Sequence, residues 1–387
     1  FGDGFLNNTF LGQSIILDSY DRPYRVDLRN RIRRGTEYNS ILSFFDDLDN
    51  ELIAVPVPKG SSLAFSLERD ERQNLLNMGF LGIQGNRQAS VLGPINFATT
   101  VAKEFKFSVA QDVSGLSFFG NSIIDDVSGG LFYGTSWTLA PQAGLLGSGN
   151  SFKVAHAFND KAKASFGMHQ SKGGSALSAG GGGKGYLTHL HYSEEVQNGV
   201  RYGVSTGYVE EVNAMFRSSS GGAFGAANDN VSHYVSVAAT WEIAKKTHIF
   251  GVYTDLNVKP SFSDDSILNN WSRTYANAFN IGLISESIIT RGDKVGFSIS
   301  QPLRVRKSEV DITLPTGRNL SGDIFQVTRR VDSGPSGRQT DMQLAYMLTE
   351  SNRGSEIAAF TRVTLEAGHD KSAKPQGGFG FRWKKRF

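Results

Sequence analysis

Apolar and polar residues alternate with period two along the C-terminal two-thirds of the chain. The longest run covers residues 355–366. One face of this run carries Ile357, Ala359, Thr361, Val363 and Leu365, and the other carries mostly polar or charged side chains. Such a strand exceeds the five or six residues usual in globular sheets. It has the length of a tilted strand that crosses a bilayer.

The same alternation recurs in at least five other segments, where one face is mostly apolar or aromatic and the other is mostly small, polar or charged. These segments are residues 200–209, 235–242, 250–257, 279–284 and 341–348. An outer-membrane barrel needs this pattern, with lipid outside and water or a polar filling inside. The sequence therefore predicts an all-β, antiparallel transmembrane β-barrel. We expect Val252, Leu283, Leu344 and Val363 to face lipid.

Connection lengths give a second signal, because short and long connections alternate. Short ones include residues 159–161, 244–246 and 349–354, and long ones include 172–184, 213–230 and 259–275. Barrels of the outer membrane have short periplasmic turns and long extracellular loops. We therefore expect a bacterial outer-membrane location, with the C-terminus in the periplasm and the long loops outside. A water-soluble sandwich is the alternative, but it does not require this regularity.

Twelve strands are predicted in the barrel. They lie near residues 163–171, 185–193, 199–210, 231–242, 247–258, 277–286, 293–302, 308–315, 323–331, 339–348, 354–366 and 377–387. Weaker candidates near 129–137 and 151–157 would make fourteen. We assign residues 129–387 to the barrel and residues 1–128, whose periodicity is mixed, to a linker and pre-barrel or plug region.

Composition fits export and adds little else. The chain has 387 residues, 44 glycines, 27 phenylalanines, 10 prolines and no cysteine, and its 40 basic and 37 acidic residues are interspersed. Glycine and aromatic residues with few prolines fit many strands joined by flexible loops. No polybasic tract indicates a nucleic-acid partner.

Aromatic residues alternate at the C-terminus. Phe379, Phe381, Trp383 and Phe387 lie in the last nine residues. A strand edge offers backbone pairing while alternate side chains give specificity. We interpret this pattern as a signal for the barrel-assembly machinery, against the alternative of an ordinary aromatic edge strand.

Three segments resemble the C-terminal translocators of subtilisin-type serine protease autotransporters (type V secretion). They are Phe1-Gly2-Asp3 followed by residues 17–28, Ser300-Gln301-Pro302-Leu303-Arg304-Val305 followed by Leu314-Pro315, and Ser336-Gly337-Arg338-Gln339 leading to Tyr346 and Phe387. The resemblance implies a barrel that anchors and helps to export a covalently linked passenger, itself a serine protease. It also implies that outer-membrane lipid is a partner and that the barrel is no enzyme.

Charged residues on the non-lipid faces are candidates to line the lumen. These are Arg201, Asp255, Glu286, Asp341, Glu356, Arg362 and Arg382. They would form a solvated wall or hold a plug. An even strand number would start the barrel in the periplasm, so a segment must then pass through the lumen. The nearest candidate lies between Asp70 and Asp126.

No catalytic, cofactor or metal site is expected. Gly134-Thr135-Ser136 is similar to a subtilase nucleophile segment, but its spacing to Pro141 is wrong and no His or Asp block precedes it. His189 and His191 have the spacing of metal ligands on a strand, but they lack a third ligand. Residues 179–185 lack the Ser or Thr of a phosphate loop. The competing functions are a free-standing porin or small-solute channel and, less favoured, an outer-membrane enzyme or adhesin barrel.

Overall fold

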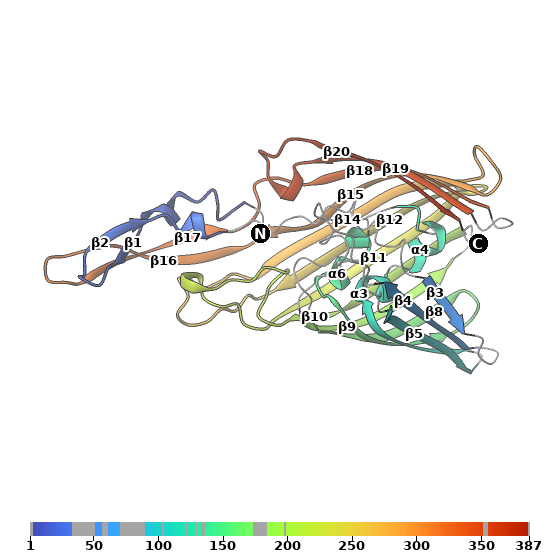
Figure 1. Ribbon diagram of the computed structural model, residues 1–387, viewed down its shortest axis with the longest axis horizontal. Coiled ribbons are helices and arrows are strands. Elements are labelled where there is room, and N and C mark those ends of the chain that lie inside the picture. The colour runs from blue at the N-terminus through green and yellow to red at the C-terminus, as the bar shows by residue number, and fades with distance from the viewer. Residues whose placement is uncertain are drawn as a thin grey trace, which may run out of the picture.

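The computed structural model describes residues 3–32, 51–55, 61–69, 90–102, 104–120, 122–128, 130–132, 136–172, 184–196, 199–350 and 355–385. Fifteen strands form one antiparallel sheet, in which the strands follow chain order, with β13 left out between β12 and β14 and with β16 and β17 left out between β15 and β18. Figure 1 shows this sheet curving around a group of short helices. Among the described residues no pairing joins the edge strands β3 and β20.

The strands of this sheet are mostly 9 to 15 residues long. Their bounds are β3 (Glu51–Val55), β4 (Ser61–Arg69), β5 (Ser90–Ala102), β6 (Phe105–Ser114), β7 (Ser148–Ala157), β8 (Ala162–Lys172), β9 (Lys184–Glu195), β10 (Val200–Glu211), β11 (Asn230–Ala244), β12 (Thr247–Val258), β14 (Thr274–Glu286), β15 (Asp293–Lys307), β18 (Thr340–Glu350), β19 (Ser355–Leu365) and β20 (Gln376–Lys385).

The all-β, antiparallel prediction is confirmed, but the expected strand set is wrong in two places. Predicted strands 308–315 and 323–331 are β16 (Glu309–Arg318) and β17 (Ile324–Asp332), which leave the main sheet and pair with each other and with β13 (Leu268–Asn269). Their alternation is real, but Val310, Ile312 and Leu314 are buried against the N-terminal segment rather than facing lipid.

The predicted boundary between residues 128 and 129 is not where the hydrogen bonding divides the chain. Strands β3 to β6 precede that boundary, yet they belong to the same sheet as the later strands. Of the two weaker candidates, 151–157 lies in β7, whereas 129–137 overlaps the helix α5 (Ser136–Leu139). In β3 to β6 the runs of alternating apolar and polar residues are too short to distinguish these strands from a linker by sequence.

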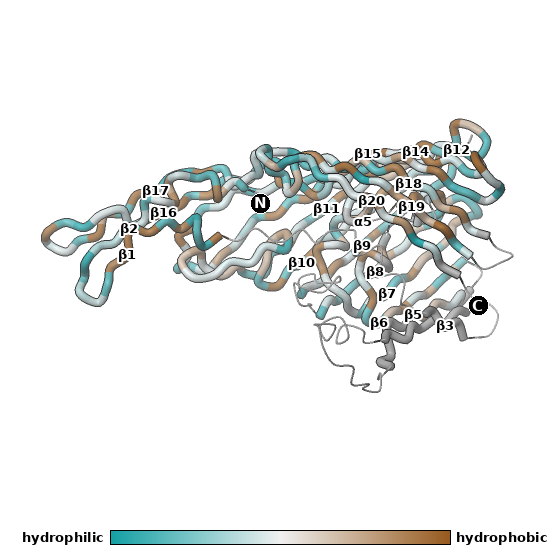
Figure 2. The backbone as a smooth tube through the Cα atoms, turned by 45° about the horizontal axis from the view of Figure 1, so that its top comes forward, coloured by the Kyte–Doolittle hydropathy of each residue, from teal (hydrophilic) through white to brown (hydrophobic). Residues whose placement is uncertain are grey.

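The outward face of the sheet carries an apolar belt. In β11 the burial alternates strictly, with Ser232, Ser236 and Thr240 buried and with Val235, Val237 and Trp241 exposed. Figure 2 shows apolar and polar positions alternating along the strands. Further exposed apolar residues continue the belt on other strands: Phe166, Met168, Leu190, Val204, Ile281, Leu283, Phe297, Ile299, Leu344 and Val363.

In five of the six alternating segments the face predicted to be outward is outward in the structure. In the sixth, residues 250–257 of β12, the two faces are reversed. In β12, Phe250, Val252 and Leu256 are buried, while Ile249 and Tyr253 are exposed. Val252 therefore does not face lipid. The sequence pattern equated apolar with outward, but in this strand the inner face packs on apolar helices.

The connections alternate as predicted. Strands β7 and β8, β9 and β10, β11 and β12, and β14 and β15 are joined by at most six residues. The longer connections, including the one from β15 to β18 that contains β16 and β17, lie at the other end of the sheet. In Figure 1 the chain's C-terminal end lies opposite the projecting β1 (Ser14–Leu17), β2 (Pro23–Val26), β16 and β17. We call these the short-turn end and the long-loop end.

A Leu-to-Arg pair tests the belt. Leu344 lies in the middle of β18 with its side chain half exposed, so Leu344→Arg should lower the unfolding free energy in lipid vesicles by about 2–4 kcal/mol. Leu320, fully exposed at the tip between β16 and β17, is the matched control. Leu320→Arg should change the same quantity by less than about 0.5 kcal/mol. Equal effects at both positions would show that the belt is not in contact with lipid.

Candidate functional site: the filled interior and the long-loop end

The connection between β6 and β7 folds back inside the curve of the sheet. It contains α3 (Gly115–Phe119), α4 (Ser122–Ser128), α5 and α6 (Pro141–Gly144). Helix α4 contacts β10 and β11, while α5 contacts β12, β14 and β15. Figure 1 shows these helices lying across the inner side of the sheet. We call residues 115–146 the inner segment.

Two apolar clusters hold the inner segment against the strands. In one, Ile124, Leu131 and Leu139 meet strand residues that include Phe250 and Ile284. In the other, Phe118, Phe119, Leu145 and Leu146 meet strand residues that include Leu187 and Leu256. Most of these side chains are under 5% exposed. Burying a Leu or Phe side chain contributes about 1.5–3 kcal/mol, so the two clusters strongly favour the seated segment.

Glycines on the inner face provide recesses for these side chains. A Cβ at Gly203 would lie 2.3 Å from Ile123 Cδ1, and one at Gly167 would lie 2.3 Å from Phe119 Cε1. At Gly296 a Cβ would lie 2.6 Å from atoms of both Leu131 and Phe132. The strands are therefore shaped to fit the inner segment, because any larger side chain at these positions would displace it.

Three hydrogen bonds from strand side chains also hold the inner segment. Lys294 Nζ donates to the carbonyl of Val127 at 3.0 Å, and Lys153 Nζ donates to that of Phe118 at 3.2 Å. Both carbonyls lie in the last turn of a short helix, where a cation is favourable. Asn280 Nδ2 also donates to Thr138 Oγ1 at 3.0 Å.

Six of the seven charges predicted to line the lumen lie on the inner face. Glu286 forms an ion pair with Lys294 (3.0 Å), Arg362 pairs with Asp341 (2.7 Å), and Arg382 pairs with Glu356. Arg201 contacts Glu195 at 2.9 Å and Asp126 of α4 at 3.4 Å. The interior therefore carries paired charges around its apolar centre.

Asp255 is the exception and must be corrected. It lies on the outward face of β12 with Tyr253, and Arg306 approaches it to 3.0 Å. Its place near the long-loop end explains this, because the apolar belt gives way there to polar residues such as Asn257 and Arg273, which hydrogen-bond to each other. The sequence pattern assigned Val252 to the outward face of β12, so alternation assigned Asp255 to the inner face. Both assignments are wrong.

The remaining candidate residues are placed as follows. Phe379, Phe381 and Trp383 are exposed on the outward side of the edge strand β20, while Phe387 lies outside the described residues. Ser136 begins α5. Most of residues 179–185 lies outside the described part of the chain. The described residues contain no group of three metal-ligating side chains and no helix long and apolar enough to cross a membrane.

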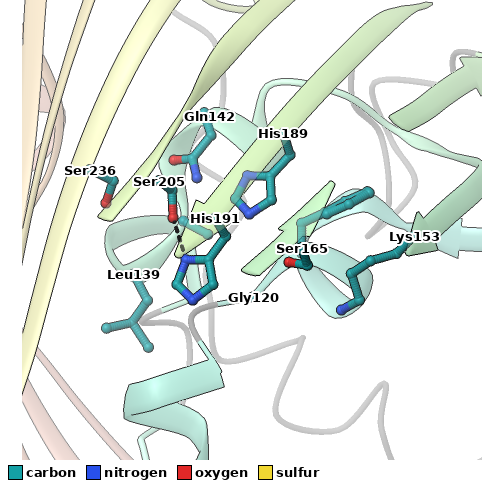
Figure 3. A pocket seen from close by; sticks show the side chains of 11 residues that line it. Gly120, Leu139, Gln142, Lys153, Ser165, His189, His191, Ser205 and Ser236 are labelled. Atoms are coloured by element: carbon teal, nitrogen blue, oxygen red, sulfur yellow. Dashed lines mark hydrogen bonds between the residues drawn. The ribbon is translucent and has the colours of Figure 1, made fainter. Parts of the chain in front are cut away.

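His189 and His191 lie on the inner face of β9, and their rings stack at 6.0 Å. His189 Nδ1 is 2.7 Å from the hydroxyl of Tyr234, and His191 Nδ1 is 2.8 Å from Ser205 Oγ. Figure 3 shows His191 beside a small cavity. The inner segment covers this cavity with Gly120, Leu139 and Gln142.

The N-terminal segment packs at the long-loop end, outside the curve of the sheet. It comprises η1 (Thr9–Gln13), β1, β2 and η2 (Leu28–Arg31). Phe10, Leu11 and Leu28 form a core with Ile312 and Leu314 of β16. This core is the reason that β16 and β17 project beyond the sheet (Figure 1). Sequence reasoning missed it because the apolar face of β16 has the same period as a lipid-facing strand.

The three segments that carry the family resemblance meet at the base of this projection. The carboxylate of Asp3 accepts hydrogen bonds from the backbone N–H of Ser336 at 2.7 Å and from its hydroxyl at 2.5 Å. Burial raises the pKa of Asp3, but the Ser336 hydrogen bonds outweigh it, so the pKa is lowered overall. Arg304 Nε donates to the carbonyl of Gly337 at 2.7 Å. We call Asp3, Arg304 and residues 335–339 the junction.

His369 completes the junction from the loop after β19. Its Nδ1 accepts from the backbone N–H of Gln339 at 2.9 Å, so the proton must be on Nε2, which donates to the carbonyl of Leu303 at 3.1 Å. Burial lowers the pKa of His369 to about 4. The ring is therefore neutral at pH 7 with both nitrogens satisfied.

Comparisons with known proteins leave the family open. No protein-family model and no curated sequence matches the chain. Among solved structures it is similar to OmpTdeltaL8, a loop-deletion mutant of the outer membrane protein OmpT of Vibrio cholerae (10% identity, 85% of this chain and 87% of that one, TM-score 0.49). It is also similar to OprB of Pseudomonas putida (10%, 84% and 82%, 0.47) and to an anion-selective porin from Comamonas acidovorans (8%, 80% and 76%, 0.44). At these values the likeness identifies neither family nor function.

A pair of glycine substitutions tests the recesses. Gly203→Leu should unseat α4, because the new side chain occupies the space of Ile123. Limited proteolysis within residues 115–146 should then accelerate, and conductance in planar bilayers should rise. Gly251, on the outward face, has nothing nearer than 4.0 Å to a built Cβ, so Gly251→Leu should leave both unchanged. Equal proteolysis of the two variants and the parent would contradict this fit.

The junction should weaken in acid. Because the pKa of His369 is about 4 in the folded chain and 6.5 when unfolded, its contribution is complete above pH 6.5 and is lost as pH falls toward 4. The upper bound is about 3 kcal/mol at 1.36 kcal/mol per pKa unit. Amide exchange of Gln339, corrected for intrinsic rates, should accelerate across this window. In His369→Gln that added acid dependence should disappear, and its persistence there would exclude His369 as the cause.

Proposed function

We propose that this chain is an outer-membrane translocator that anchors, and helps to export, a passenger preceding Phe1 in a longer precursor. The observation that carries the proposal is the position of the N-terminal segment. It is fastened at the long-loop end by the Asp3–Ser336 hydrogen bonds and by the core around Phe10 and Leu11. A passenger joined to it would emerge at that end of the sheet.

The membrane location rests on the belt and the connections. An exposed apolar band on strands of 9 to 15 residues fits lipid. With the short turns in the periplasm, the long-loop end and the N-terminal segment are extracellular. Backbone groups inside a bilayer must be satisfied, so we propose that the two sheet edges are brought together in the membrane.

The passenger is proposed to be a subtilase from the resemblance at residues 17–28, 300–305 and 336–339. In the structure, parts of these segments lie in the N-terminal hairpin and the junction, where upstream chain would meet the barrel. The barrel itself is proposed to have no catalytic role. We also propose that the barrel-assembly machinery recognises the exposed aromatic residues of β20.

A free-standing porin is the competing function, and the filled interior speaks against it. Helices α4 and α5 cross the inner face and are buried in apolar clusters, rather than lining an open water path. A porin would also have no need to fasten upstream chain at the long-loop end.

Surface display tests the proposal. A protease-cleavable epitope placed before Phe1 should be removed by protease added to intact Gram-negative cells that express the chain behind a signal peptide. The same epitope in the short turn at Lys245–Lys246 should be protected until the outer membrane is opened. A protected upstream epitope with an accessible turn epitope would reject the translocator and its orientation.

A junction variant separates anchoring from barrel folding. Asp3→Asn keeps the shape of the side chain but removes the charge that accepts two hydrogen bonds from Ser336. Loss of a charged hydrogen bond costs about 1.5–3 kcal/mol. We expect faster proteolysis near residues 3–32, with unchanged heat-resistant barrel mobility on gels. The exposed Asp21→Asn is the control, and equal proteolysis of both variants would contradict the role of Asp3.

A further inference from the structure

The cavity beneath the inner segment has features of a ligand site rather than of a packing gap. Its volume is about 30 Å³, room for roughly two water molecules. Its lining is largely polar and comes from α3, α5, α6 and strands β7 to β11. The polar residues are Gln142, Lys153, Ser165, His189, His191, Ser205 and Ser236.

Two buried polar atoms in this lining have no partner within the described residues. They are His191 Nε2 and Gln142 Oε1, in side chains that are 8% and 2% exposed. A buried polar group without a hydrogen bond costs about 1–3 kcal/mol. Both side chains are among those that line the cavity (Figure 3). The cavity therefore presents two buried polar atoms to any group that can hydrogen-bond.

The charge around the cavity is positive. Lys153 Nζ has one hydrogen bond, to the carbonyl of Phe118, and no carboxylate within 4.0 Å among the described residues. By strand register, Lys106 and Lys163 lie on the same inner face of the neighbouring strands β6 and β8. The inner positions of β6, β7 and β8 carry no acidic residue. A partly buried cation without a counter-charge is costly.

Besides Lys153, three of the lining side chains, His191, Gln142 and Ser236, can act as donors toward the cavity. If the Ser205 hydroxyl donates to His191 Nδ1 (2.8 Å), the ring proton is on Nε2 and points to the cavity. Ser236 accepts from Thr254 at 2.8 Å, which leaves its own proton available. The amide of Gln142 can be turned so that its NH₂ faces inward, because oxygen and nitrogen are interchangeable in shape. Lys153 also disfavours a cation bound to the two histidines.

We propose that this cavity binds a small monovalent anion of the halide class, held by Lys153, His191 and the hydroxyl of Ser236. The anion neutralises Lys153, which also rests on the rings of Phe118 and Phe119 at 5.2 and 6.0 Å from their centroids. Anion binding thereby stabilises α3 on the strands, so the anion serves as a structural ligand of the inner segment. This inference does not depend on whether the chain exports a passenger.

Bromide crystallography on the full chain in detergent tests the site directly. An anomalous bromide peak is expected in the cavity within hydrogen-bond distance of Lys153 Nζ and His191 Nε2. Lys153→Met should remove the peak, while Lys161→Met, in the exposed turn between β7 and β8, should retain it. Water alone in the cavity of the parent protein, or a peak that persists in Lys153→Met, would overturn the proposal.

A solution measurement covers a variant that fails to crystallise. The thermal midpoint of the parent should rise with chloride and saturate, and should not rise with gluconate at equal ionic strength. Losing the charged donor in Lys153→Met should weaken the apparent chloride affinity about 10- to 100-fold, whereas Lys161→Met should match the parent. Identical chloride and gluconate curves for the parent would contradict the proposal, as would stabilisation by Zn²⁺ that His191→Gln abolishes.

Discussion

The fold depends on one constraint: the strands have an apolar surface on each of their two faces. On the outer face, Val235, Val237 and Leu344 need an apolar surrounding. On the inner face, Phe250, Leu256 and Ile284 need one as well, and the inner segment supplies it. A sheet with an apolar outer face alone could enclose water. Because the inner face is apolar as well, the connection between β6 and β7 must fold inward, since no other described segment covers these inner residues.

This two-sided requirement also explains which parts of the fold were predictable. Period two fixes which residues share a face, and it identified the long strands and the alternation of short and long connections. It cannot say what each face meets. In β12 the inner face is the more apolar one, so Val252 and Asp255 were both assigned to the wrong side. In β16, Ile312 and Leu314 pack on Phe10 and Leu11, and a soluble core was taken for a lipid surface. Hydrophobicity alone does not distinguish three apolar neighbours: lipid, helix and soluble core.

The candidate site was predictable in pieces and not as an assembly. The segments around Asp3, Arg304 and Ser336 were identified separately, and Asp3 lies 333 positions from Ser336 in the sequence. Their contact depends on β16 and β17 leaving the sheet, so that Asp332 and Ser336 return to the base of the projection beside the N-terminal segment. No local pattern encodes that return. The recess at Gly203 was also invisible, because glycine in a strand reads as a weak position until the side chain of Ile123 that fills it is known.

The filled interior and the fastened N-terminal segment restrict how a passenger could be exported. β3 lies toward the short-turn end, as Figure 1 shows. The expectation that linker must cross the lumen assumed an even strand count, whereas the described part of the main sheet has fifteen strands; residues 33–50, between the N-terminal segment and β3, lie outside the described residues. The inner segment contacts strands from β6 to β15, so a chain that passed through this space would have to separate those contacts. Passage and the seated segment are therefore mutually exclusive. In the proposed translocator, export through the lumen would have to precede the seating of residues 115–146 on the glycine recesses, and the seated segment would be the end state of that proposed export rather than its route.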